Sequence, residues 1–522
     1  MTVDLWEGAM RQVTHLRSDL AAWTRESIAV DLGERALEAL NRDVAVPASL
    51  AAERGSRIAL LTRLFWLGET LDDDDLREAL PTTIADGQPA DLPFLEVATD
   101  GWRSRWQIVP VDVPDHLRPM IKESNPESTA AQTDTVWIAS TRGALQGNRH
   151  ASDFVMGVGG ASRTLASLAA YQPGQRVLDL GTGSGIHAIL AALAGARVTA
   201  TDISQPALEL AEFNADLNGA KIDLREGSLF EPVAGERFDV IVSNPPFVIT
   251  PPSARGTVGA LDYRDAGFEG DQLSSEVVRG LSDHLVAAGR AWMLLNWEIA
   301  QGADDPYSAL RDWAQPGLDL HVIMREQLPV TSYIEMWLAD GGLRPGHPDY
   351  EPSYRAWLTD FDDRGVTHVG LGYVSAGPTC QSPEDAGAPL FLGQHLRGTA
   401  PPNLHAYVES LWRQRNLTPA DLTALAPIAT DVVEHRFYHP GEPDPWIIKF
   451  TQTGGFGEEI LATTALAGFV SVADGELTTG QIIAALAELL SEDPATLTSQ
   501  LLPKVVEMKR LGMLTFVAPH CE

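Results

Sequence analysis

Between residues 151 and 377, short apolar runs alternate with longer segments in which apolar residues recur at helical spacing. Seven of these runs have the length and composition of strands: 176–180, 197–203, 221–227, 238–244, 290–296, 318–326 and 366–374. Near-continuous apolar strands that alternate with helices are typical of a parallel sheet covered on both faces. We therefore predict an α/β domain with a seven-stranded sheet over residues 151–377.

The segments before this domain follow different patterns. Residues 1–85 read mostly as helices, and "SRIALLTRLFWLGETL" places apolar residues at helical spacing, with Gly68 as a stop. The acidic run 72–75 suits a solvated helix start better than a metal site. Residues 86–150 hold short apolar stretches between prolines, such as "WQIVPVDV" and "TVWIAS", which predict a β-rich connecting region.

Residues 378–522 are expected to form a smaller domain behind a linker over 375–389. "LTTGQIIAALAELL" predicts a helix that is capped by Thr478 or Thr479. Its apolar face would comprise Ile482, Ile483, Leu486, Leu489 and Leu490. A second helix runs from Pro494 to about Gly512, and the strand "MLTFV" follows it. Two helices followed by a strand suggest a winged-helix-like module, which we interpret as a protein-binding or lid element because this region is acidic.

The overall composition excludes several classes of protein. The 522 residues are 44% hydrophobic, yet no apolar run approaches the roughly 20 residues that span a bilayer. The first residues lack the layout of a signal peptide, and Cys380 and Cys521 suggest neither a disulfide framework nor a zinc site. These features predict a cytoplasmic protein with no membrane partner and no metal. The net charge of −33 argues against strong non-specific binding to nucleic acid.

A glycine-rich turn follows the first strand of the α/β domain. In "VLDLGTGSGIHAILAAL", Asp179 ends the strand, and Gly181, Gly183 and Gly185 open the next helix. Glycines let the backbone bend sharply and let a ligand approach it. A turn at the carboxyl edge of a parallel sheet is where ligands of such folds bind. Dinucleotide-binding domains use a related loop, but the spacing here is Asp-x-Gly-x-Gly-x-Gly.

Acidic and polar residues also follow the next two strands. Asp202 ends the second strand, where a carboxylate can accept both hydroxyls of a ribose; the alternative is a helix N-cap. Ser228, within "REGSLFEP" after the third strand, can form hydrogen bonds, or it is an ordinary turn residue. His187, in the helix after the glycine turn, is expected to serve packing.

The fourth strand ends in "SNPPFVITPP", which places an amide, two prolines and a ring at a rigid polar corner. Amide and aromatic-amine nitrogens are poor nucleophiles because their lone pair is delocalised. The side-chain carbonyl of Asn244 and the backbone carbonyl of Pro245 could hold the two hydrogens of such a nitrogen and fix its geometry. The ring of Phe247 offers a face on which a planar amide or base can stack.

These motifs resemble those of class I S-adenosylmethionine (SAM)-dependent N-methyltransferases. The similarity covers roughly residues 151–300 and is to the HemK-type release-factor glutamine methyltransferases and to the guanine-N2 and adenine-N6 methyltransferases. The chain also resembles a multidomain actinobacterial group. The resemblance implies a Rossmann-like fold, SAM as cofactor, and catalysis by Asn244, Pro245 and Phe247. The cofactor-binding residues that it implies are Asp179, Gly181, Thr182, Gly183, Gly185, Asp202, Ile203, Gly227, Ser228, Leu229 and Asn244.

The substrate stays open between several alternatives. The methyl acceptor is expected to be a planar nitrogen in a protein glutamine or in a nucleobase. Phe247 stands where the glutamine enzymes have tyrosine, a feature that is shared with RNA guanine methyltransferases. A small-molecule methyltransferase of specialised metabolism is the second hypothesis, with the flanking domains as a lid. The third hypothesis is a SAM-binding regulator without catalysis.

Overall fold

The chain was analysed as a computed structural model that describes residues 3–53, 55–85, 88–127, 133–146, 154–252, 268–379, 390–396 and 404–518. It divides into two compact units. The first comprises Met1–Gln315 and Gln327–Pro378, and the second comprises Pro316–Glu326 and Thr379–Glu522. Within the described residues, no helix combines the length and the apolar character needed to cross a membrane.

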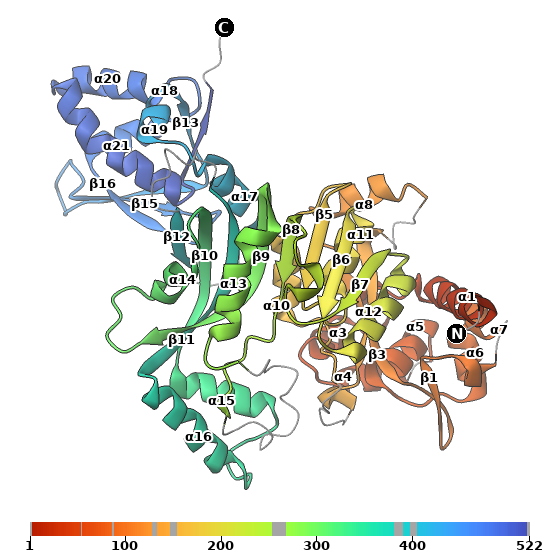
Figure 1. Cartoon of the computed structure of the whole chain (residues 1–522). Coiled ribbons are helices and arrows are strands. Elements are labelled where there is room, and N and C mark those ends of the chain that lie inside the picture. Colours follow the sequence, from red (N-terminus) through yellow and green to blue (C-terminus); the bar gives the residue numbers. More distant parts are fainter. Residues whose placement is uncertain are drawn as a thin grey trace. The chain divides into compact units, whose positions relative to one another are not determined.

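A twisted sheet organises the first unit (Figure 1). Its strands lie in the order β11-β9-β8-β5-β6-β7, and β5 to β9 are parallel to one another. β11 is antiparallel to β9. Their bounds are β5 Arg176–Leu180, β6 Arg197–Asp202, β7 Ile222–Glu226, β8 Phe238–Ser243, β9 Leu285–Ala300 and β11 Val366–Pro378. All six predicted strands in this unit are confirmed, and the seventh is β10, Leu318–Pro329, most of which belongs to the second unit.

The strand order reverses at β5. The chain winds from β5 outward to β6 and β7, then returns to place β8 on the other side of β5. Ligands of doubly wound sheets bind at such a switch point, at the carboxyl ends of the strands. The hydroxyl of Ser243 donates to the carbonyl of Leu180 at 2.7 Å, which ties the ends of β8 and β5 together. The helices of this region are α10 Gly160–Leu168, α11 Ile186–Leu193, α12 Gln205–Asn218 and α13 Gln272–His284.

The first 85 residues form helices that share a core with α12. Buried Trp23 and Phe65 belong to the same apolar cluster as Phe94 and as Phe213 of α12. The helix after Ser56 ends at Gly68, whose φ of +70° is left-handed, as the sequence predicts. The bounds are α1 Val3–Leu20, α2 Arg25–Leu32, α3 Glu34–Leu40, α4 Val46–Ala52, α5 Arg57–Leu61, the π-helix Thr62–Leu67, α6 Asp73–Ala79 and α7 Pro81–Ala85. Asp72 caps α6 by accepting from two backbone N–H groups, which confirms the helix start.

The connecting region contains two antiparallel strand pairs. β1 (Leu95–Ala98) pairs with β2 (Gly101–Ser104), and β3 (Trp106–Asp112) pairs with β4 (Thr135–Thr141). The helix α8 spans Arg118–Ser124 and lies between β3 and β4 in the sequence. Two asparagines of α12 bind the backbone of β4 as a neighbouring strand would. The amide of Asn214 bonds both the N–H and the carbonyl of Ala139, and Asn218 does the same with Trp137.

The remaining elements of the first unit are helical. α14 covers Ser308–Trp313, and a pair of helices, α15 (Val330–Asp340) and α16 (Tyr350–Asp363), connects β10 to β11. Tyr333, Ile334, Trp357 and Phe361 from this pair form one apolar cluster with Val248 and Ile249. The helix pair therefore packs on the segment that follows β8.

The described part of the second unit contains α17 to α21 and six strands besides β10. α20 is capped by Thr478 in a capping box with Gln481, which settles the choice between Thr478 and Thr479. The expectation that Leu489 and Leu490 are part of the buried face is wrong, because they are 78% and 37% exposed. The last turn of α20 extends beyond the core, where burial ends at Ala487. The bounds are β12 Phe391–His395, α17 Leu404–Gln414, α18 Pro419–Ala424, β13 Ala426–Ala429, β14 Val432–Phe437, β15 Ile447–Gln452, β16 Glu459–Ala462, α19 Thr464–Ser471, α20 Thr479–Leu490, α21 Pro494–Arg510 and β17 Leu514–Val517.

The predicted linker over 375–389 coincides only in part with described residues. Residues 375–378 form the end of β11 instead, and Ser375 and Ala376 continue its pairing with β9. Residues 380–389, with Cys380, lie outside the described residues, and so does Cys521.

Candidate functional site

The glycine turn joins β5 to α11 at the centre of the sheet. Gly181, Gly183 and Gly185 have φ values of +72°, +54° and +85°, a region that favours glycine. No atom of the described residues lies within 4 Å of a Cβ built at Gly181 or Gly183, so the backbone faces open space there. At Gly185 the added Cβ would lie 3.2 Å from the Cβ of Ala211, and this glycine therefore permits close packing of α11 on α12.

The carboxylate of Asp179 stabilises the glycine turn by hydrogen bonds. One carboxylate oxygen accepts from the Thr182 hydroxyl at 2.6 Å and from the Ala188 N–H at 3.0 Å. The other oxygen is buried and has no hydrogen-bond partner among the described residues. Burial raises the pKa of the Asp179 carboxyl to about 7. Thr182 is also buried, so its hydroxyl orders the turn from within.

Asp202 lies beside the glycine turn at the end of β6. Its carboxylate accepts from the N–H of Gly183 at 2.9 Å and from the N–H of Ser204 at 2.9 Å. Ser204 caps α12 through its side chain, so the alternative interpretation of Asp202 as the N-cap is wrong. Burial raises the pKa of the Asp202 carboxyl. An ionised carboxylate has about four acceptor positions, so acceptor capacity remains for a ligand beside these backbone donors.

Next to Asp202, Ile203 is 73% exposed, which places a large apolar side chain at the open edge of the sheet. His187, by contrast, is buried, and burial lowers its pKa to about 4. It lies in α11 among apolar residues, as the sequence predicts.

The segment after β7 approaches Asp202 from the next strand. The N–H of Gly227 donates to the carbonyl of Asp202 at 3.0 Å, and Ser228 opens a turn by accepting from the N–H of Glu231. Leu229 has a φ of +46°, which is uncommon for a residue with a side chain. Three of the residues expected to bind the cofactor, Gly227, Ser228 and Leu229, therefore form one tight bend.

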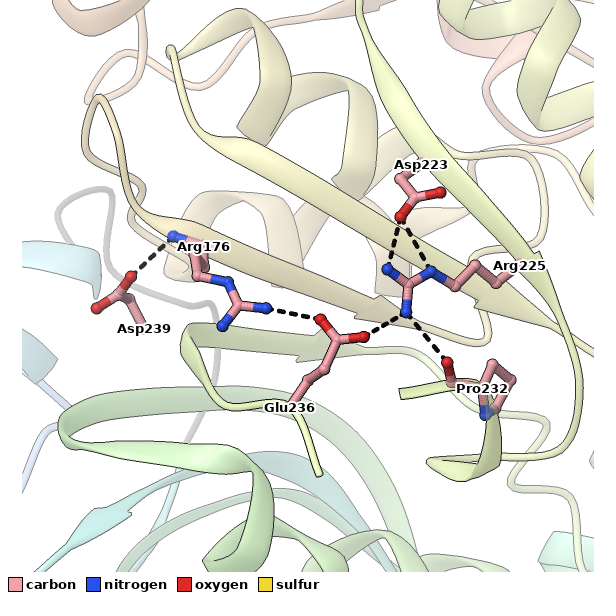
Figure 2. Close-up of polar contacts among 6 residues, drawn as sticks. All are labelled: Arg176, Asp223, Arg225, Pro232, Glu236 and Asp239. Carbon is pink, nitrogen blue, oxygen red and sulfur yellow. Dashed lines mark hydrogen bonds and ion pairs between the residues drawn. The ribbon is translucent and has the colours of Figure 1, made fainter. Parts of the chain in front are cut away.

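Figure 2 shows what holds this bend. The guanidinium of Arg225 donates to the carbonyl of Pro232 at 3.1 Å and to the carboxylates of Glu236 at 2.5 Å and Asp223 at 2.7 Å. Arg176, at the start of β5, donates to the other oxygen of Glu236 at 2.7 Å. The network connects the segment between β7 and β8 to the strands β5 and β7.

Asn244 follows β8 at the same edge of the sheet as the glycine turn. Its side-chain NH2 donates to the hydroxyl of Ser162 at 3.0 Å, and Ser162, on α10, is only 7% exposed. Because the oxygen and nitrogen of an amide point in different directions, the carbonyl oxygen of Asn244 points away from Ser162. Sequence reasoning did not find Ser162, since a serine in a glycine-rich segment carries no recognisable pattern.

The segment beyond Asn244 is anchored by the helix pair. The N–H of Ile249 donates to the hydroxyl of Tyr333 at 3.0 Å, and the side-chain amide of Asn296 donates to the same oxygen at 3.1 Å. All three residues are buried, and burial raises the pKa of the Tyr333 hydroxyl. The sequence analysis also did not identify Tyr333 and Asn296, because both lie far from the corner along the chain.

Phe247 lies between these two anchors and is partly buried. It lines a small pocket together with Pro246, Val248 and residues around the start of α13, among them Asp271. The carboxylate of Asp271 accepts from the N–H of Glu298 at 2.9 Å, and burial raises the pKa of the Asp271 carboxyl. The corner thus combines an oriented amide, a stiff proline pair and an aromatic ring beside a pocket.

Comparison with known proteins agrees with this geometry. Residues 156–258 match the family model of the methyltransferase small domain. This part of the chain is a methyltransferase domain. It has the Rossmann-like class I fold that the sequence predicts, as the strand order shows. Residues 20–105 match a domain of unknown function, DUF7059.

The curated relatives are similar over the methyltransferase domain. The release factor glutamine methyltransferase of Bordetella pertussis is 40% identical over 136 residues, 24% of this chain and 50% of that protein. The enzyme of the same name from Xylella fastidiosa strain 9a5c is 49% identical over 138 residues, 25% and 49% of the two chains. The ribosomal protein uL3 glutamine methyltransferase of Bradyrhizobium diazoefficiens is 39% identical over 156 residues, 28% and 46%. The chain spans about half the length of the curated relatives it matches.

The residues at the edge of the sheet fit S-adenosyl-L-methionine. The open backbone at Gly181 and Gly183 admits a ligand, and the Asp202 carboxylate has acceptor positions for vicinal hydroxyls. Ile203 offers an exposed apolar surface to a planar base. These features lie together at the ends of β5, β6 and β7, next to the corner after β8.

Proposed function

We propose that the chain is a SAM-dependent N-methyltransferase that methylates the side-chain amide of a glutamine in a protein. The observation that carries the proposal is the amide of Asn244, which is held at the same sheet edge as the glycine turn. The relatives named as glutamine methyltransferases support an amide nitrogen as the acceptor.

The corner after β8 would hold the acceptor nitrogen. The carbonyl oxygen of Asn244 and the backbone carbonyl of Pro245 accept one hydrogen each from the acceptor NH2. The ring of Phe247 stacks on the acceptor plane and limits its rotation. The two carbonyl oxygens and the aromatic ring together restrict the acceptor nitrogen to one orientation. This restriction reduces the entropic part of the activation barrier for methyl transfer.

The reaction requires little proton chemistry from the protein. When it is bound, SAM supplies an electrophilic methyl group to this site. The acceptor nitrogen gains a positive charge as its lone pair is used, and the two carbonyl oxygens stabilise that charge. The excess proton then leaves to water, so no general base is required. Pro245 and the residues Val248 to Thr250 are buried, so the backbone of the corner is held in place.

The regions that flank the methyltransferase domain would determine which substrate the protein binds. We propose four regions: a helical domain over 1–85, a connecting region over 86–150, the methyltransferase domain over 151–377 and a winged-helix-like domain over 378–522. Three helices, α19 to α21, and the antiparallel pair of β13 and β17 support the last of these. Its charge of −9, from 8 basic and 17 acidic residues, favours a protein partner over nucleic acid. We place the protein in the cytoplasm.

The proposal is tested by labelling with methyl-tritiated SAM. Lysate from the source organism lacking this gene is incubated with the parent or with Asn244→Ala, and the products are digested separately with protease, RNase and DNase. We expect label that depends on the parent and is lost to protease. Loss to RNase or DNase would move the acceptor to a nucleobase, and label confined to small molecules would favour a metabolite. Equal labelling by Asn244→Ala would overturn the assigned corner.

A further inference from the structure

One hydrogen bond outside the sequence motifs determines how the Asn244 amide is oriented. The NH2 of Asn244 donates to the hydroxyl of Ser162 at 3.0 Å, across 82 residues of sequence. Ser162 lies in the first turn of α10, and its side chain is nine-tenths or more shielded from solvent, with 7% of the residue exposed. The bond is therefore partly buried, and its direction matters more there than at a surface.

An asparagine amide has two orientations that differ by a half-turn about its last torsion. This torsion has a broad, roughly two-fold profile, so packing alone distinguishes the orientations poorly. In one orientation the carbonyl oxygen faces the methyl acceptor, and in the other the NH2 does. An NH2 facing the acceptor would place hydrogen against hydrogen and could not hold the acceptor nitrogen.

We propose that Ser162 is a positioning residue for methyl transfer, which keeps the NH2 of Asn244 on α10 and its carbonyl oxygen toward the acceptor. The inference rests on the proposed function of the same corner. In this role Ser162 acts through Asn244, to which it is hydrogen-bonded. Loss of its hydroxyl would lower the transfer rate and leave SAM affinity unchanged.

Four variants separate this role from a purely structural one. Ser162→Ala removes the hydroxyl, and Ser167→Ala is the control on the same helix, because the Ser167 hydroxyl bonds only the backbone carbonyl of Thr164 in the described structure. Ser162→Thr and Ser162→Val form a matched pair of nearly equal shape and helix propensity that differ by the hydroxyl. Any clash caused by the larger side chain in the buried site affects both variants alike, so it does not contribute to the difference between them.

The measurements are the initial rate of methyl transfer from tritiated SAM to the lysate protein fraction, SAM affinity by calorimetry, and the thermal midpoint. We expect Ser162→Ala to lose between about 5-fold and 100-fold in rate at saturating SAM. The transfer rate of Ser162→Thr should exceed that of Ser162→Val by a similar factor. The dissociation constant for SAM and the thermal midpoint should be equal in these two variants. Ser167→Ala should retain the parental rate.

The outcomes distinguish this inference from the proposed function. A parent that labels protein while Ser162→Thr and Ser162→Val react at equal rates overturns the positioning role alone. Equal losses of rate and of thermal midpoint in Ser162→Ala, without a difference within the pair, would also overturn it. A parent that labels no protein overturns the proposed function, and this inference with it.

Discussion

The hydroxyl oxygen of Tyr333 lies 3.0 Å from the backbone nitrogen of Ile249, and these two residues are 84 positions apart in the chain. The same oxygen accepts from the amide of Asn296 at 3.1 Å. A helix pair inserted between β10 and β11 thus fixes the backbone just beyond the corner at Asn244. The corner is held at its amide by α10 and at its far end by α15.

The first prediction concerns this anchor. Tyr333→Phe removes the shared acceptor and leaves a backbone N–H and a side-chain amide buried without it. We expect the free energy of unfolding to fall by about 1–3 kcal/mol. Tyr354→Phe, at an exposed hydroxyl on α16, is the control and should change it by less than about 0.5 kcal/mol. Chemical denaturation measures both, and equal denaturation midpoints would contradict the role of Tyr333.

The second prediction concerns cofactor affinity. Asp202→Asn keeps the shape of the side chain but loses its charge and one acceptor oxygen. The dissociation constant for SAM should rise by about tenfold or more, because hydrogen bonds to a charged group contribute about 1.5–3 kcal/mol. Calorimetry measures the change. Asp223→Asn, on the adjacent strand β7, is the matched control, and an equal effect of the two variants would remove Asp202 from the cofactor site.

The third prediction concerns pH. Burial raises the pKa of Asp179 to about 7, so the folded state holds a proton that the unfolded state releases at lower pH. The folded state therefore loses stability relative to the unfolded state as pH rises from about 4 to about 7. Asp179→Asn lacks this titration. Denaturation at pH 5 and pH 8 should show the free energy of unfolding of the parent falling relative to the variant. A constant difference between the two proteins would refute the buried proton.

The fourth prediction concerns the network in Figure 2. Arg225→Ala removes the bonds to Pro232 and Glu236 that hold the bend after β7. Partly exposed ion pairs contribute about 0–1 kcal/mol, so SAM affinity should fall by no more than about fivefold. Arg355→Ala removes a comparable exposed pair on α16 and should leave affinity unchanged. A hundredfold loss in Arg225→Ala would mean that Arg225 contacts the ligand directly.

Local patterns were sufficient to predict most of the α/β framework. β5 begins and ends where the apolar run 176–180 does, and Gly181, Gly183 and Gly185 adopt left-handed conformations in the sharp turn that their spacing predicts. Both features depend on neighbouring residues alone. The exposure of Leu489 was not predictable in this way, because helical periodicity does not tell where the packing partner ends.

The supports of the site could not be predicted. Ser162 reaches Asn244 and Tyr333 reaches Ile249 through tertiary folding, across 82 and 84 residues, and neither residue type forms a motif with its partner. Likewise, nothing in the sequence of α12 indicates that Asn214 would bond the backbone of β4. Sequence thus identifies the residues at strand ends, whereas the residues that orient them depend on which elements become neighbours.

The most direct test of the account is to locate the methyl group on the product. Lysate protein that has been labelled by the parent would be digested to peptides, and tandem mass spectrometry would assign the modified atom. We expect the methyl group on a glutamine side-chain amide, in peptides that stay unmodified with Asn244→Ala. A methyl group on a different kind of residue, or on glutamine with both proteins, would contradict the account.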